Sequence, residues 1–182
     1  PPPLPSYFIP SRASVIISPP NLWEQWTKEI QKFLHSESLK IIAAADIKIL
    51  KQCTVDDIAQ ADVIVLSYKF FDSPQYKDRL AHFGSGGQGT RCFVRALLET
   101  CENELRTSED EQLHDGTCSA IPSTLGGMKF PVLELFYFHR IIVDEFHELV
   151  CAVGQDSHPF YRAMVSLCEL HARSRWGLTS TP

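Results

Sequence analysis

The chain has 182 residues, 44% apolar and 21% charged, which are the proportions of a globular domain with a sizeable core. Its formal net charge of −5 excludes a uniformly basic nucleic-acid-binding protein. The six scattered cysteines form no C-x-x-C pair, which argues against a zinc ribbon and indicates the reduced thiols of an intracellular protein, and no apolar run approaches the ~20 residues of a membrane span.

The first predicted strand follows a proline-rich start. Residues 1–12 contain five prolines and are expected to form an extended linker. Ala13 to Ser18 is apolar and β-branched and predicts a strand, which Pro19 and Pro20 close. A helix is expected over residues 21–35, capped by Asn21. Its apolar side chains fall at helical spacing: Leu22, Trp26, Ile30 and Phe33.

Two further strands are predicted before residue 73. Leu39 to Ala44 is the first, and Ala61 to Ser67 is the second and almost entirely apolar. Between them, residues 46–52 suggest a helix, and Thr54 to Asp57 match a capping box that opens another helical turn. Strands that alternate with helices in this way predict parallel βαβ units and therefore an α/β fold.

An irregular stretch from about residue 73 to about residue 130 interrupts this alternation. A helix is expected over residues 90–106, and residues 107–129 are polar and acidic enough that much of this stretch should be mobile. Seven acids and three bases between Thr90 and Met128 give it a local net charge of −4. Gly84 to Gly89 spells G-x-G-x-x-G, but no buried strand precedes it and no lysine follows it, so a flexible loop is the better interpretation.

The last third of the chain carries the residues with the clearest chemistry. Ile141 to Val143 predicts a strand buried on both faces, and it ends in Asp144 and Glu145, with His147 two positions on. Acids at the carboxyl end of a parallel strand lie where α/β sheets bind ligands. One carboxylate can hold hydrated Mg²⁺ and the other can activate a water. On these residues alone, a solvated acidic turn explains the pattern equally well.

A helix and a strand are predicted to complete the chain. The helix is expected over residues 158–173, and the strand over residues 176–179. The side chains expected to face inward from the helix are Met164, Leu167, Cys168 and His171.

Taken together, four segments resemble the Swi/Snf-type ATPases, the DNA-translocating branch of the superfamily-two helicases. Pro19 to Ile30 fits the family's P-x-x-L-x-x-Q-W-x-x-E-I motif, Asp62 to Tyr68 fits its next strand and turn, and Arg140 to His147 fits R-I-I-x-D-E-x-H. Arg175 to Pro182 fits R-W-x-L-T-G-T-P, with Ser180 at the usual glycine. Phe146 likewise stands where alanine is commoner.

The resemblance implies a RecA-like lobe over residues 13–182, with a mostly parallel sheet flanked by helices and a partly disordered helical insert at about 73–130. It implies ATP and Mg²⁺ as cofactors. Asp144 would hold Mg²⁺ through water, Glu145 would activate the attacking water, and His147 would couple this site to Thr179, Ser180 and Thr181. The DNA-contacting residues implied are Pro19, Pro20, Asn21, Ser67 and Tyr68.

The implied function is ATP-driven movement on double-stranded DNA or chromatin in the nucleus, with a second RecA-like lobe as partner and the acidic insert as a candidate protein-binding surface. The family's phosphate-binding Gly-Lys-Thr loop is absent from the printed sequence. The chain is therefore expected to be an inactive fragment of a larger ATP hydrolase. The alternative is a non-catalytic RecA-like interaction module that lost this loop.

Overall fold

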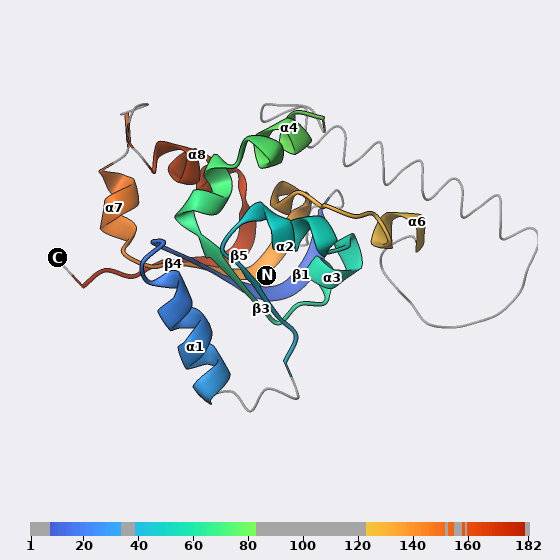
Figure 1. Cartoon of the computed structure of the whole chain (residues 1–182), viewed down its shortest axis with the longest axis horizontal. Helices are drawn as coiled ribbons and strands as arrows, with labels where there is room; N and C mark the ends of the chain where they lie inside the picture. Colours follow the sequence, from blue (N-terminus) through green and yellow to red (C-terminus); the bar gives the residue numbers. More distant parts are fainter. Residues whose placement is uncertain are drawn as a thin grey trace, which may run out of the picture.

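A parallel sheet organises the computed structural model, which describes residues 8–33, 39–82, 123–151, 153–154, 158 and 160–180. The strands of these residues form one five-stranded sheet in the order β2-β3-β1-β4-β5 (Figure 1). Every pairing is parallel, which confirms the predicted α/β architecture. The strands are β1 (Ile9–Ser18), β2 (Ile41–Ala44), β3 (Val63–Ser67), β4 (Phe136–Val143) and β5 (His171–Gly177).

Helices connect and flank these strands. The described elements are α1 (Trp23–Phe33), α2 (Ile47–Gln52), α3 (Val55–Ala59), η1 (Tyr68–Asp72), α4 (Pro74–His82), α6 (Ser123–Gly126), η2 (Leu133–Leu135), α7 (Phe146–Val150) and α8 (Tyr161–Glu169). The Thr54 capping box is confirmed, because its hydroxyl accepts from the Asp57 N–H while the Asp57 carboxylate accepts from the Thr54 N–H. The glycine-rich loop and the helix predicted for residues 90–106 lie outside the described residues.

The two faces of the sheet are covered unequally. The connection from β1 to β2 runs in the opposite direction to the later crossovers between described strands. Right-handed connections therefore place α1 on one face of the sheet and the other described helices on the opposite face (Figure 1). The opposite face carries the main core, where Val15, Ile17, Ile64 and Leu66 are almost fully inaccessible. On the α1 face, Ile142 is only half-buried and its neighbour Trp176 is 58% exposed. The prediction that Ile141 to Val143 is buried on both faces is therefore wrong for Ile142.

Several boundaries differ from those predicted, and the largest differences lie at the two ends of the chain. Strand β1 begins at Ile9, not Ala13, because residues 9–11 already pair with Phe136 to Phe138 of β4. Helix α1 begins at Trp23, two positions after Asn21, and the Pro19 carbonyl accepts from the N–H groups of Leu22 and Trp23.

Another difference lies near the end of the chain. Helix α8 stops at Glu169, and His171 to Gly177 form β5. Cys168, predicted to face inward, is exposed, whereas Ala163 and Leu170 are buried. The apolar pattern of a helix continues in the sequence to His171. His171 is nevertheless in a strand, because it pairs in parallel with Tyr137 of β4.

Candidate functional site

The two adjacent acids follow the carboxyl end of β4. The Asp144 N–H donates to the Ile17 carbonyl at 2.9 Å and so continues the ladder between β4 and β1. Glu145 then adopts a left-handed conformation, with φ 48° and ψ 45°. A non-glycine residue in this region costs on the order of 1–3 kcal/mol, so the surrounding structure must hold it there. The turn brings both acids to one hollow of about 470 Å³ beside α1, lined also by Gln25, Trp26 and Glu29.

Asp144 is held by three donors from different parts of the chain. Its Oδ2 accepts a hydrogen bond from Nε1 of Trp26 at 2.7 Å, and its Oδ1 accepts from the Glu145 N–H at 3.0 Å. Its backbone carbonyl accepts from the Tyr68 hydroxyl. Burial, followed by the nearby charges of Glu148, Asp144 and Glu145, raises the pKa of Tyr68, so this hydroxyl stays protonated and remains a donor.

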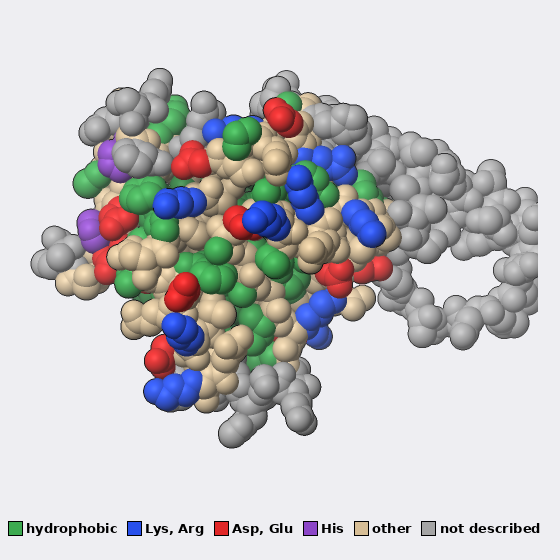
Figure 2. All heavy atoms as spheres, viewed as in Figure 1, with side chains coloured by type: hydrophobic (Ala, Val, Ile, Leu, Met, Phe, Trp, Pro, Cys, Tyr) green, Lys and Arg blue, Asp and Glu red, His purple; other side chains and the backbone are tan. Residues whose placement is uncertain are grey.

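Glu145 is connected to the segment that follows β5. The Ser180 hydroxyl donates to Oε1 of Glu145 at 2.9 Å. Oε2 lies 3.2 Å from Nδ1 of His147, an ion pair when the imidazole is protonated, and Nδ1 also lies 2.9 Å from Oγ1 of Thr179. The structure thus brings Glu145, His147, Thr179 and Ser180 together, while Thr181 lies outside the described residues. Figure 2 shows acidic and histidine side chains gathered at the end of the molecule where α7 lies.

Main-chain bonds fix the same junction. The Leu178 N–H donates to the Val143 carbonyl, and the Phe146 N–H donates to the Leu178 carbonyl, both at 2.8 Å. These bonds extend the pairing of β4 with β5 beyond the last residue of each strand. The chain after β5 is therefore joined to the acid pair both by main-chain hydrogen bonds at Leu178 and by the side-chain hydrogen bond from Ser180.

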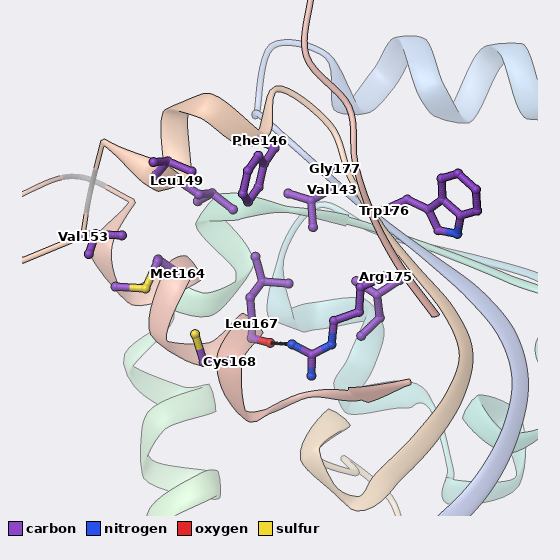
Figure 3. A pocket seen from close by; sticks show the side chains of 12 residues that line it. Val143, Phe146, Leu149, Val153, Met164, Leu167, Cys168, Arg175, Trp176 and Gly177 are labelled. Atoms are coloured by element: carbon purple, nitrogen blue, oxygen red, sulfur yellow. Dashed lines mark hydrogen bonds between the residues drawn. The ribbon is translucent and has the colours of Figure 1, made fainter. Parts of the chain in front are cut away.

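Phe146, found where the resembling family usually has alanine, borders an apolar hollow of about 440 Å³ between α7, α8 and β5 (Figure 3). A Cβ atom added to Gly177 would lie 2.9 Å from Cγ of Phe146, closer than side-chain carbons approach. The ring of Phe146 therefore requires glycine at position 177.

We expect Gly177→Ala to destabilise the protein by about 1–3 kcal/mol, because the ring of Phe146 must move out of its position against β5. The same change in a Phe146→Ala background should cost much less, since the obstructing ring is gone. Urea unfolding of the two single variants and the double variant measures the coupling. Strictly additive costs would contradict the direct contact.

The residues predicted to contact DNA divide into two groups. Ser18 of β1 is in register with Ser67 of β3, so the turns after both strands leave the same edge of the sheet. Pro20 is half-buried and Asn21 is exposed, whereas Pro19 is buried and contributes its carbonyl to the start of α1.

The second turn, at Ser67 and Tyr68, is less accessible than the first. Tyr68 is fully inaccessible and Ser67 is 3% exposed, with the Ser67 hydroxyl accepting from the Lys69 N–H. The predicted contact of this turn with DNA stays a prediction, and neither side chain is exposed at the surface. The Tyr68 hydroxyl donates a hydrogen bond to the backbone carbonyl of Asp144.

Trp26 is the site residue that sequence reasoning missed. Its spacing with Leu22 and Ile30 predicts only an apolar helix face and gives no partner for its indole N–H. The bond to Asp144 joins residues 118 positions apart, so local periodicity gives no sign of it. The available signal was chemical, because a buried or half-buried tryptophan usually finds an acceptor for its N–H.

Within the described residues, no group of three or more histidine, cysteine, aspartate or glutamate side chains is arranged to hold a metal ion. The oxygens of Asp144 nevertheless suit Mg²⁺, which proteins often bind through one or two carboxylates together with substrate phosphates. Among the same residues, no helix is both long and apolar enough to cross a membrane.

Comparison with known proteins shows similarity to a domain family and to a fungal protein. The model of the SNF2-related domain family matches residues 9–182. The chain is also similar to the DNA (cytosine-5-)-methyltransferase DMT5 of Cryptococcus neoformans var. grubii serotype A, with 32% identity over 103 residues. That alignment covers 53% of this chain and 4% of DMT5, so the chain spans a small part of this relative.

Proposed function

The chain belongs to the SNF2-related domain family of ATP-hydrolysing, helicase-like enzymes, and from that membership we propose that it forms part of the first RecA-like lobe of a DNA-dependent ATPase. In this proposal the complete protein couples ATP hydrolysis to movement on DNA. Residues 13–182 belong to the lobe, and residues from about 73 to 130 are an insert within it.

The observation that carries this proposal is the set of contacts around Glu145. Its carboxylate accepts a hydrogen bond from Ser180 and lies beside His147, which in turn reaches Thr179. A carboxylate in a solvated acidic turn is hydrated by water and needs no such partners. A carboxylate that must point at a water molecule does need them, because general-base catalysis depends on position.

Each residue then has a distinct task. Asp144 would hold Mg²⁺ through water, and Mg²⁺ bound with nucleotide phosphates supplies charge neutralisation during phosphoryl transfer. Glu145 orients the attacking water and accepts its proton. Ser180 fixes the Glu145 carboxylate through a hydrogen bond, and His147 lies beside the carboxylate and contacts Thr179. A displacement of the segment after β5 would therefore change the position of Glu145.

Double-stranded DNA or chromatin is the proposed partner. The family is DNA-dependent, and the methyltransferase relative is named for an activity on DNA. Pro20 and Asn21 are the accessible groups at the turn proposed to meet the phosphate backbone. We also propose a second RecA-like lobe in the same protein and a protein partner at the acidic insert. The proposed cellular role is chromatin remodelling or DNA repair in the nucleus.

The complete coding sequence is the first test. We expect a Gly-Lys-Thr or Gly-Lys-Ser phosphate loop upstream of Ile9 and a second helicase lobe downstream of Pro182. A complete coding sequence without a phosphate loop would contradict the proposal and favour a non-catalytic interaction module.

A further inference from the structure

Two tryptophans on the same helix donate hydrogen bonds to acceptors of different kinds. Trp23 of α1 donates its indole N–H to the Val65 carbonyl of β3 at 3.2 Å. Trp26, one turn later, donates to the carboxylate of Asp144 at 2.7 Å. The second distance is typical of a hydrogen bond to a charged acceptor. Only Trp26 therefore reaches the acid pair, although both indoles hold α1 against the sheet.

Two hydrogen bonds fix the orientation of the Asp144 carboxylate, and the carboxylate can still bind a cation. The Glu145 N–H contacts Oδ1, and the Trp26 N–H contacts Oδ2. Each carboxylate oxygen has two lone pairs, so one donor on each oxygen sets the plane of the group without exhausting its acceptors. The remaining lone pairs can accept from water in the shell of Mg²⁺.

Helix α1 depends on such contacts for its placement. Of the α1 side chains that the structure describes, none is fully buried. The Pro19 carbonyl accepts from the N–H groups at the start of the helix, and no other helix of the described residues lies on this face of the sheet (Figure 1). Its attachment near Asp144 comes from Trp26, which also lines the hollow that Asp144 and Glu145 share.

We infer that Trp26 is a positioning residue for the Mg²⁺ site: its indole N–H holds the Asp144 carboxylate in the orientation that receives the hydrated ion. This inference rests on the proposed function, in which Asp144 binds Mg²⁺ together with nucleotide. Outer-shell donors of this kind typically change metal affinity by roughly 10- to 100-fold when they are removed.

The test compares Trp26→Phe with Trp23→Phe in the complete protein. Each variant keeps an aromatic ring and loses one indole N–H, but only Trp26→Phe removes a donor to Asp144. Binding of a fluorescent ADP analogue is measured over a Mg²⁺ titration and again in EDTA. For Trp26→Phe we expect the Mg²⁺ midpoint to rise at least about tenfold, with the affinity in EDTA unchanged. For Trp23→Phe the midpoint should stay within about twofold of wild type.

Other outcomes overturn the inference in distinguishable ways. Equal midpoints for Trp26→Phe and wild type, with Mg²⁺-dependent binding intact, refute the role of Trp26 and leave the proposed function standing. A loss of affinity in EDTA that matches the loss in Mg²⁺ assigns Trp26 to general packing. Nucleotide binding by the wild-type protein that does not respond to Mg²⁺ overturns both proposals.

Discussion

A Glu145→Gln variant of the complete protein is expected to lose DNA-stimulated ATP hydrolysis by about 10²- to 10⁴-fold, the usual contribution of a positioned general base. Glutamine has the shape of glutamate, and its carbonyl oxygen can still accept the hydrogen bond from Ser180. Its amide cannot accept a proton from water. The loss should therefore lie in turnover, with nucleotide and DNA affinity close to those of wild type. Phosphate release at saturating ATP and DNA measures it.

Glu148→Gln is the matched control for this change. Glu148 lies three residues further on, in α7, and does not line the hollow that Asp144 and Glu145 share. The same loss of one negative charge there should leave turnover within about twofold of wild type, because Glu148 lies outside the hollow proposed to hold the attacking water. Equal losses in the two variants would show that net charge, not the position of Glu145, determines the rate.

A Glu134→Gln variant is expected to raise stability above pH 7 and to remove a pH dependence from the wild-type protein. Glu134 is buried, its Oε2 accepts from the Tyr76 hydroxyl at 2.6 Å, and its Oε1 has no hydrogen-bond partner. Burial raises the pKa of Glu134 to about 7, whereas an unfolded glutamate titrates near 4.5. The folded chain therefore holds this proton more tightly than the unfolded chain does.

The sign of the effect follows from that difference. The contribution of Glu134 to the free energy of unfolding is fully present below pH 4.5 and is lost as the pH rises through 7. The loss is about 3 kcal/mol, and glutamine, which does not titrate, avoids it. Asp57, whose pKa a hydrogen bond from Lys40 lowers to about 2, acts in a separate window below pH 4.

Urea unfolding between pH 5 and pH 8 measures this difference in wild type and Glu134→Gln. Glu24→Gln serves as a control, because Glu24 lies on the exposed surface of α1 and its removal should not change the slope. Wild-type and Glu134→Gln stabilities that run parallel over this range would show that Glu134 is already ionised in the folded protein.

Much of the fold follows from local sequence pattern. The β-branched runs at Val15 to Ile17 and Val63 to Val65 are strands, and their alternation with helices gives the parallel sheet. Polar strands were harder to predict. His171 to Arg173 fit the continuation of the preceding helix, and Pro10 suggested a linker. Both segments nevertheless pair with β4, which supplies hydrogen bonds that local preference does not describe.

The candidate site divides in the same way. The position of Asp144 and Glu145 at the carboxyl end of a strand was predictable, because an apolar run that ends in acids has few other placements. The donors that hold these acids were not predictable. Trp26, Tyr68 and Ser180 come from three separate segments, and only the crossovers of the sheet bring them to one place.

The central claim is that this acid pair belongs to a DNA-dependent ATPase. It is tested most directly by the rate of ATP hydrolysis of the complete protein, measured with Mg²⁺ in the presence and absence of double-stranded DNA. We expect DNA to stimulate hydrolysis and Glu145→Gln to abolish it. Hydrolysis that is undetectable with DNA, or that continues unchanged in Glu145→Gln, would contradict it.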